Sequence, residues 1–121
     1  MAMTSLDSKQ LIFSGTASKK GRHLAVTPAN SSLAHLAYGR IRLDTEVPRA
    51  AFETGGRETA MICMKGSCRL TVNGTPHDIG THDGVYIPRG SSVEVTTAGE
   101  VDLVECSADV TGDYPFQIVR Y

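Results

Sequence analysis

Several acidic and basic side chains that could take part in proton transfer lie close to glycine-containing turns or predicted strand ends. A carboxylate can act as the base, and a cationic side chain can stabilise the negative charge that develops as the proton leaves. No Ser-His-Asp or Cys-His arrangement stands at a recognisable spacing, and no glycine-rich phosphate loop precedes a helix. We therefore consider Glu58 and Glu105 as candidate catalytic bases. Candidate substrate-binding residues are Arg57, Tyr86, Arg89 and His82.

The orientation of Glu105 depends on where its strand ends. Val101 and Leu103 share one face of a predicted strand, and Glu105 continues that face, which would aim its carboxylate into the core. Alternatively, the strand has already ended and Glu105 is solvated, which is the commoner situation for a glutamate. The sequence leaves both alternatives open and favours the second.

The histidines and cysteines do not form a recognisable metal site. His77 and His82 flank the segment HDIGTH and could meet near one end of the fold, but histidines in surface loops are far commoner than metal ligands. The three cysteines, Cys63, Cys68 and Cys106, include no CxxC pair, so neither a zinc ribbon nor a redox motif is indicated. Each cysteine lies in an alternating apolar segment and is interpreted as a small core residue.

Length and composition indicate one globular domain. The chain has 121 residues, of which 40% are hydrophobic and 21% charged, and its net charge of −1 gives no reason to expect a nucleic-acid or membrane partner. No apolar run approaches the roughly 20 residues of a membrane-spanning helix, and the polar N-terminus does not resemble a secretory signal. We predict a cytoplasmic protein with a loose arm at residues 1–9 and a single domain at residues 10–121.

Turn signals recur at short intervals from residue 44 onward, and the segments between them have strand length. Asn73-Gly74 is the strongest signal, because a type I′ hairpin turn needs positive φ at both central residues. Apolar and polar side chains alternate within the segments, which is typical of antiparallel sheets with one buried face. The predicted core consists of Met61, Cys63, Cys68, Leu70, Val72, Val93, Val95 and Leu103.

The register between two of these strands can also be predicted. If Lys65-Gly66 is a two-residue turn, Cys63 lies opposite Cys68 on the inner face. Glu58 then points away from the core unless a bulge intervenes before the turn.

Two segments of the chain resemble the cupin superfamily. RETAMICMKGSCRLTVNG (residues 57–74) resembles the first half of a cupin barrel, and GVYIPRG (residues 84–90) resembles the second half. Together with GRHLAVTP and SADVTGDYP, these segments resemble the N-terminal half of the 5-deoxy-glucuronate and 5-keto-4-deoxyuronate isomerase family, over roughly residues 11–117. The resemblance implies a single-domain, all-β cupin fold, a small antiparallel β-barrel or jelly roll.

The resemblance also sets an expectation about metal. A metal-binding cupin supplies His-x-His and Glu from one motif and a histidine from the second. In this chain the His-x-His would fall at Phe52 and Thr54, or at Glu53 and Gly55, and the later histidine would fall at Val93. None of these residues is a histidine, so we predict no metal and no other cofactor.

The implied function is related to sugar-acid isomerisation in inositol and uronate catabolism. In that family two cupin domains pack in tandem and the second carries the metal ligands, so a lone first domain would be expected to form a homodimer or a higher homo-oligomer. If the chain is active, an aldose–ketose isomerase acting on a sugar acid is expected. The alternative is a non-catalytic cupin that binds a small metabolite or serves in assembly; a metal-dependent dioxygenase is disfavoured by the missing histidines.

Overall fold

The computed structural model describes residues 13, 15 and 18–121, and all the helix or strand structure in this part of the chain is β-strand. The arm predicted for residues 1–9 lies outside the described residues. Nothing in the described chain forms a helix with the length and apolar character needed to cross a membrane. The ten strands are β1 (Gly21–Val26), β2 (Leu36–Leu43), β3 (Arg49–Glu53), β4 (Arg57–Gly66), β5 (Cys68–Val72), β6 (Thr75–Ile79), β7 (Gly84–Ile87), β8 (Ser92–Thr96), β9 (Val101–Asp109) and β10 (Gln117–Val119).

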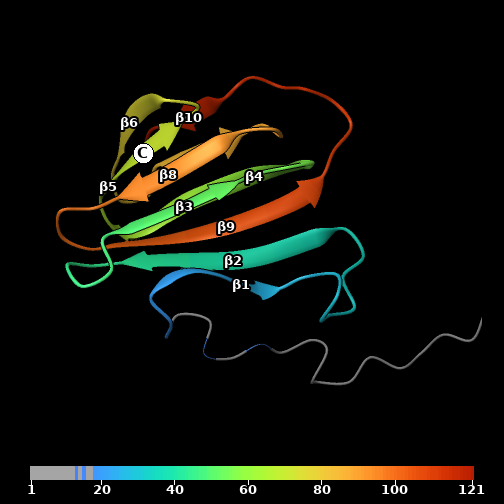
Figure 1. Ribbon diagram of the computed structural model, residues 1–121, viewed down its shortest axis with the longest axis horizontal. Coiled ribbons are helices and arrows are strands. Elements are labelled where there is room, and N and C mark those ends of the chain that lie inside the picture. The colour runs from blue at the N-terminus through green and yellow to red at the C-terminus, as the bar shows by residue number, and fades with distance from the viewer. Residues whose placement is uncertain (1–12, 14, 16–17) are drawn as a thin grey trace, which may run out of the picture.

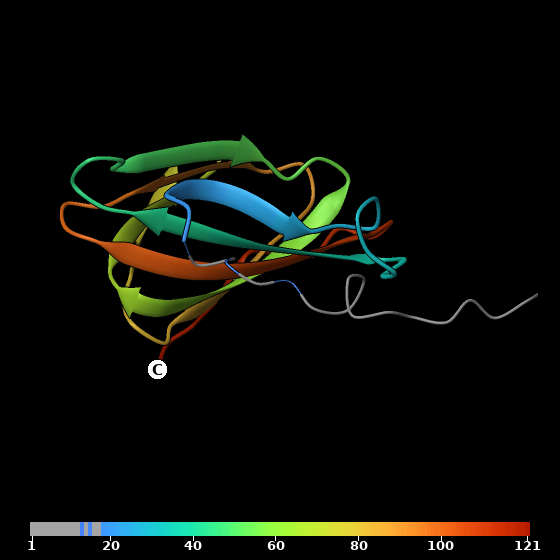
Figure 2. The ribbon, with the colours of Figure 1, turned by 90° about the horizontal axis from the view of Figure 1, so that it is seen from below.

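The strands form two antiparallel sheets that pack face to face (Figures 1 and 2). The six-stranded sheet has the order β1-β2-β9-β4-β7-β10, and the four-stranded sheet has the order β3-β8-β5-β6. Strands far apart in the sequence are therefore neighbours, and β9 lies between β2 and β4. This arrangement is a small antiparallel barrel of two sheets, which confirms the all-β prediction.

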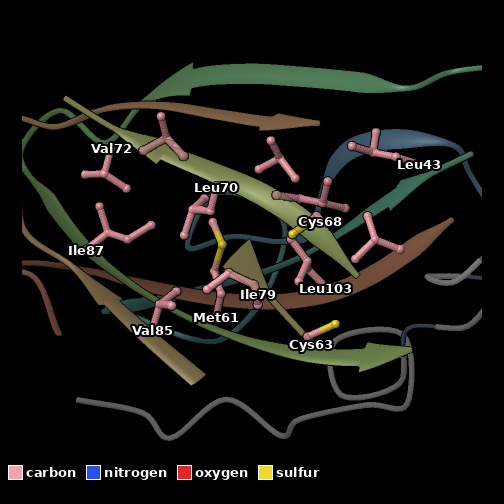
Figure 3. Close-up of a cluster of buried hydrophobic side chains, with 14 residues drawn as sticks. Leu43, Met61, Cys63, Cys68, Leu70, Val72, Ile79, Val85, Ile87 and Leu103 are labelled. Atoms are coloured by element: carbon pink, nitrogen blue, oxygen red, sulfur yellow. The ribbon is translucent and has the colours of Figure 1, made fainter. Parts of the chain in front are cut away.

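Apolar side chains from both sheets fill the space between them (Figure 3). All eight residues of the predicted core are buried, with exposed fractions between 0% for Cys63 and Val95 and 7% for Cys68. The alternation that predicted them is visible in β9, where Val101 and Leu103 are buried and Asp102 between them is partly exposed. Period-two patterning therefore identified the inner faces correctly.

The turn predicted at Lys65-Gly66 is wrong. β4 continues through Gly66, and β5 begins at Cys68 in the other sheet. Cys63 lies opposite Leu103 of β9 instead of Cys68, although both cysteines still face the core. The alternation was correct, but it does not reveal to which sheet a strand belongs.

Gly66 makes this passage between the sheets possible. Its φ is +79°, in the left-handed region, and a Cβ at this position would lie 2.0 Å from the backbone oxygen of Glu100. Only glycine avoids both the strain and the clash. A register shift between Cys63 and Lys65 precedes it, so a bulge also bends the end of β4.

Cys106 departs from the prediction that all three cysteines are core residues. It is exposed, whereas Cys63 and Cys68 are buried. In β9 the inward positions are Leu103 and Glu105, so Cys106 points to the outer face of the six-stranded sheet. Burial also raises the pKa of the Cys68 thiol to about 12, so this group stays protonated at neutral pH.

Candidate functional site

An ion pair between Arg22 and Glu105 occupies the space between the two sheets. The Nε of Arg22 donates to Oε2 of Glu105 at 2.9 Å, and Nη2 donates to Oε1 at 2.8 Å. The Glu105 side chain is completely buried, while that of Arg22 is 25% exposed. A guanidinium that binds both carboxylate oxygens supplies the hydrogen bonds that a buried carboxylate needs.

The alternative that Glu105 is solvated beyond the end of its strand is wrong. β9 runs to Asp109, and Glu105 lies opposite Gly39 of β2 and Met61 of β4. Gly39 makes room for it, since a Cβ there would lie 3.1 Å from Cγ of Glu105 and 2.9 Å from both the backbone oxygen of His23 and a side-chain carbon of Leu24. Glu105 thus lies on the same buried face as Val101 and Leu103, which was the first of the two alternatives.

Sequence reasoning did not single out Arg22. It lies opposite Ile41 in the pairing of β1 with β2, and Ile41 is fully buried. Arg22 also has the same strand parity as Leu24, which lies opposite the buried Gly39, and this was the signal that it faces inward. An arginine rarely faces a protein core unless a partner neutralises its charge. The inward direction of Arg22 could therefore be inferred only once Glu105 was known to be its partner.

The third member of this cluster is Phe52 of β3, in the opposite sheet. The guanidinium carbon of Arg22 lies 3.7 Å from the centre of the Phe52 ring, which is a cation–π contact. Phe52 is one of the positions at which a His-x-His pair was considered. The cluster therefore joins the two sheets where one metal ligand would stand.

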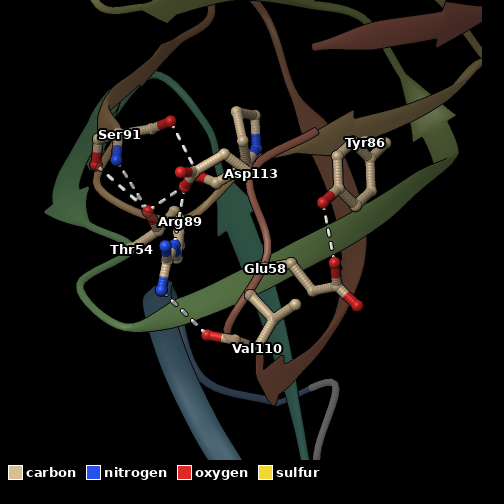
Figure 4. Close-up of polar contacts among 8 residues, drawn as sticks. Thr54, Glu58, Tyr86, Arg89, Ser91, Val110 and Asp113 are labelled. Atoms are coloured by element: carbon tan, nitrogen blue, oxygen red, sulfur yellow. Dashed lines mark hydrogen bonds and ion pairs between the residues drawn. The ribbon is translucent and has the colours of Figure 1, made fainter. Parts of the chain in front are cut away.

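Two further positions considered for metal ligands, Thr54 and Val93, do not fit a metal either. The hydroxyl of Thr54 donates to the backbone oxygen of Pro88 at 3.0 Å and accepts from the backbone N–H of Ser91 at 2.8 Å (Figure 4), and Val93 is buried and apolar. Across the part of the chain that the structure describes, no three His, Cys, Asp or Glu side chains lie close enough to hold an ion. That the protein carries no metal stays a prediction.

Glu58 and Tyr86 lie together on the outer face of the six-stranded sheet. The Tyr86 hydroxyl donates to Oε2 of Glu58 at 2.7 Å (Figure 4). This hydrogen bond to a carboxylate, with a smaller contribution from burial, raises the pKa of Tyr86 to about 12. Glu58 thus points away from the core, in agreement with the alternation along β4 although the predicted register was wrong, and lies on the opposite face of the sheet from Glu105.

Arg57 and Arg89 flank the same end of the sheet, and each is paired with an exposed aspartate. Arg57 lies 3.4 Å from Asp109, and Arg89 lies 2.7 Å from Asp113 (Figure 4) and also donates to the backbone oxygen of Val110. Both aspartate side chains are at least 80% exposed. The Arg89 guanidinium lowers the pKa of Asp113, and the carboxylate in turn raises the pKa of Arg89.

A hollow of about 320 Å³ opens beside the Glu58–Tyr86 hydrogen bond. Tyr114 and Gln117 complete its lining, so its wall combines a carboxylate, two phenols and an amide. A smaller hollow of about 200 Å³ shares Glu58 and Tyr86 and extends over Ala60 of β4. These side chains can donate and accept hydrogen bonds and can pack against a sugar ring.

The two turn histidines do not join this group. His77 stacks on Phe116 with ring centres 4.5 Å apart, and His82 contacts Tyr121 edge to face at 4.9 Å. The backbone N–H of His82 bonds to the carbonyl of Cys63, near the C-terminal end of β4, whereas Arg57 begins that strand. Of the predicted site residues, Glu58 and Tyr86 are in contact, Arg57 and Arg89 lie at the same end of the sheet with other partners, and His82 and Glu105 are elsewhere.

Comparison with known proteins identifies relatives of this fold. A sequence model of the KduI/IolB family matches residues 11–121. An IolB-like protein from Salmonella typhimurium superposes with a TM-score of 0.76 at 19% identity, covering 88% of this chain and 44% of that one. A cupin protein from Bacteroides fragilis gives a TM-score of 0.62 at 10% identity, covering 78% of this chain and 83% of that one. The cupin domain of Schizosaccharomyces pombe Cnp3 gives 0.58 at 18%, covering 64% and 58%.

The structural neighbours confirm the cupin fold predicted from the two sequence motifs. The chain spans less than half the length of the IolB-like protein that it matches. No curated protein matches the sequence.

Proposed function

This chain belongs to the KduI/IolB family of sugar-isomerase-related cupins, and on that premise we propose that it binds a small sugar acid in a domain that holds no catalytic metal. The cluster of Arg22, Glu105 and Phe52 supports the second part, because it fills the barrel where metal ligands would be needed. A bound metal would otherwise supply the electrophile for isomerisation. Arg22 is a poor substitute, since Glu105 already holds it.

The binding proposal rests on Arg57 and Arg89, which lie at the end of the six-stranded sheet where β4 begins and β7 ends, and on the outer hollow lined by Glu58. Surface ion pairs of arginine with exposed aspartate contribute only about 0–1 kcal/mol each, so the carboxylate of a ligand can replace Asp109 at Arg57 or Asp113 at Arg89. The outer hollow of about 320 Å³ is near the lower end of the range of about 300–1,000 Å³ for ligand pockets. A monosaccharide acid is the ligand class that fits this size and polarity.

Within the hollow, the ligand's hydroxyl groups would meet Glu58, Tyr86 and Gln117, and its ring would pack against Tyr114. His82 has no role in this proposal, because it lies toward the other end of β4. The second candidate function is that of an assembly domain without a ligand, which is favoured by the close packing of the barrel interior. A cytoplasmic location stays a prediction.

The experiment is a calorimetric titration of the protein with glucuronate, galacturonate and 5-deoxy-glucuronate, with glucose as the uncharged control. We expect binding of at least one acid, no binding of glucose, and affinity at least about tenfold weaker in Arg57→Met or Arg89→Met, because charge-assisted hydrogen bonds contribute about 1.5–3 kcal/mol. Arg49→Met is the matched control, since Arg49 pairs with Glu94 on the other sheet. If no acid binds at millimolar concentration, or if Arg49→Met weakens binding equally, the proposal is wrong.

A further inference from the structure

Exposed apolar side chains gather on the outer face of the six-stranded sheet. Ile62 and Met64 of β4 are 51% and 49% exposed, and Leu36 of β2 and Val119 of β10 are 49% and 68% exposed. Between them, β9 contributes Val104 and the exposed Cys106, which lies directly opposite Ala60. We call the central residues of this face the β4–β9 patch: Ala60, Ile62, Met64, Val104 and Cys106.

The outer face of the other sheet has a different character. Arg49 pairs with Glu94 across β3 and β8, and Arg69 pairs with Asp78 across β5 and β6. None of the large hydrophobic side chains that are exposed in the described chain belongs to β3, β5, β6 or β8. Among the strands of the described chain, the large exposed apolar side chains therefore lie in the six-stranded sheet only, and the others, Leu33, Tyr114 and Tyr121, lie outside the strands. Such a one-sided distribution is expected when a particular sheet face is covered by another molecule.

The charged side chains around the β4–β9 patch are balanced within the chain. Arg40 and Asp102 form an ion pair at one margin, and Lys65 bonds to Glu100 at 3.0 Å beyond it. At the opposite end of β4, Glu58 accepts the hydrogen bond from Tyr86. The patch thus has an apolar centre and a polar rim, and the charges of the rim already have partners. An apolar centre with a polar rim is typical of a protein–protein interface.

This balance of charge indicates which molecule covers the β4–β9 patch. A patch with a strong excess of one sign would call for a partner of the opposite sign and would repel a copy of itself. Here the rim holds paired opposite charges and the whole chain has a net charge of only −1, so a second identical copy meets no repulsion. A two-fold axis would place the same apolar surface on both sides of the interface.

The size of the face is also sufficient. The eight residues of β2 and nine of β9 give strands of about 26–30 Å at about 3.3 Å per residue, and β2, β9, β4 and β7 lie about 4.8 Å apart. With β4 ten residues long and β7 four, the flat area is then about 500 Å², and side chains make the accessible surface larger. A specific interface of standard size buries about 800 Å² per partner, so one sheet face approaches the area that a stable dimer needs.

We propose that the β4–β9 patch is the interface of a symmetric homodimer of this chain. The partner copy covers Ile62, Met64 and Cys106, and its edge lies beside the hollow at Glu58 and Tyr86, because the smaller hollow reaches Cys106. The dimer does not depend on ligand binding, so failure of the sugar-acid proposal leaves it intact.

The test is light scattering coupled to size exclusion on the whole chain, from about 1 to 200 µM, for the unmodified protein, Ile62→Lys and Ala51→Lys. Both positions are exposed strand residues, but Ala51 lies in β3 on the other sheet, opposite Glu94. We expect a dimer for the unmodified protein and for Ala51→Lys, and a monomer for Ile62→Lys with an unchanged circular dichroism spectrum. An unmodified protein that is monomeric at 200 µM overturns the proposal, as does a dimer that survives Ile62→Lys or is lost equally in both variants.

A second measurement needs no substitution. Cys63 and Cys68 are buried and Cys106 is exposed in the single chain, so a thiol reagent reads the accessibility of the patch. We expect one fast-reacting thiol per chain at low protein concentration and at least tenfold slower reaction at high concentration, with Ile62→Lys fast at both. A reaction rate that does not depend on protein concentration across the 1–200 µM range contradicts the interface.

Discussion

Arg22 and Glu105 are joined by two hydrogen bonds inside the sandwich although 83 positions separate them in the sequence. Arg22 comes from β1, at the edge of the six-stranded sheet, and Glu105 comes from β9 near its centre. The Phe52 ring of the opposite sheet covers the guanidinium. The pair therefore attaches the edge strand to the middle of its own sheet and to the facing sheet at the same time.

Removal of one member of this pair should destabilise the fold more than removal of both. Arg22→Met leaves the buried Glu105 carboxylate without its partner, and we expect a loss of about 3 kcal/mol in the free energy of unfolding. The double variant Arg22→Met/Glu105→Met should recover more than half of this loss, because no unpaired charge remains. Urea denaturation followed by circular dichroism measures both values.

The matched control for this series is Arg49→Met, which removes an arginine from the exposed Arg49–Glu94 pair. We expect a change within about 1 kcal/mol, as is usual for surface pairs. If Arg22→Met is no more destabilising than Arg49→Met, the pair is not the buried connection described here.

Gly66→Ala should also destabilise the protein, by about 2 kcal/mol or more. Alanine is strained at a φ of +79°, and its Cβ would collide with the backbone oxygen of Glu100, which no side-chain rotation can relieve. Gly99→Ala is the control, because its φ is not in the left-handed region and nothing lies within 4 Å of a Cβ there. Thermal unfolding compares the two, and equal melting temperatures would show that the chain does not cross between the sheets at Gly66 as described.

The Tyr86–Glu58 hydrogen bond predicts a pH dependence at alkaline pH. The folded-state pKa of Tyr86, about 12, is above the ordinary value of 10.0, so the neutral phenol is favoured by folding. Its stabilising contribution is therefore complete below pH 10 and is lost as the pH rises through 12. In an ultraviolet titration of tyrosinate, we expect an ionisation near 12 that disappears in Tyr86→Phe and moves to lower pH in Glu58→Gln. An unchanged titration curve in Glu58→Gln would contradict the assigned cause.

Strand alternation was sufficient to predict which residues face the core, but not which strands are neighbours. Cys63 and Cys68 were both placed inside correctly, yet their predicted pairing was wrong because β4 and β5 belong to different sheets. Alternation shows only whether each side chain of a strand points inward or outward. The crossing at Gly66 depends on the position of Glu100, which is distant in the sequence and could not be known beforehand.

The site was only partly predictable for the same reason. Glu58 and Tyr86 were each singled out from their place near turns, and the structure joins them by a hydrogen bond of 2.7 Å on the outer face of the six-stranded sheet. Arg22 was missed because its inward direction becomes reasonable only with Glu105 opposite, and such a long-range pairing leaves no local signal. Cys106 was wrongly predicted to be a core residue. An alternating segment has an inner and an outer face, and the sequence did not show that Cys106 belongs to the outer one.

Metal analysis of the purified protein tests the interpretation of the barrel interior. We expect well below one equivalent of zinc, iron or manganese per chain, since Phe52 and Val93 provide no ligand atoms and Thr54 already bonds to Pro88 and Ser91. Elemental analysis after dialysis without chelator measures this. About one tightly held ion per chain would refute the prediction, and variants of His77 and His82 would then locate it.

The last prediction concerns catalysis by this chain alone. Aldose–ketose isomerisation needs a base near the substrate carbon and an electrophile that stabilises the enediolate. Glu105 is buried and bound to Arg22, and Glu58 is held by Tyr86 on the outer face, so base and electrophile do not face one cavity. We expect turnover of 5-deoxy-glucuronate in a coupled assay to be no higher than background, with or without added zinc or manganese. Turnover well above background that Glu58→Gln abolishes, while Arg49→Met leaves it unchanged, would show instead that the outer hollow is an isomerase active site.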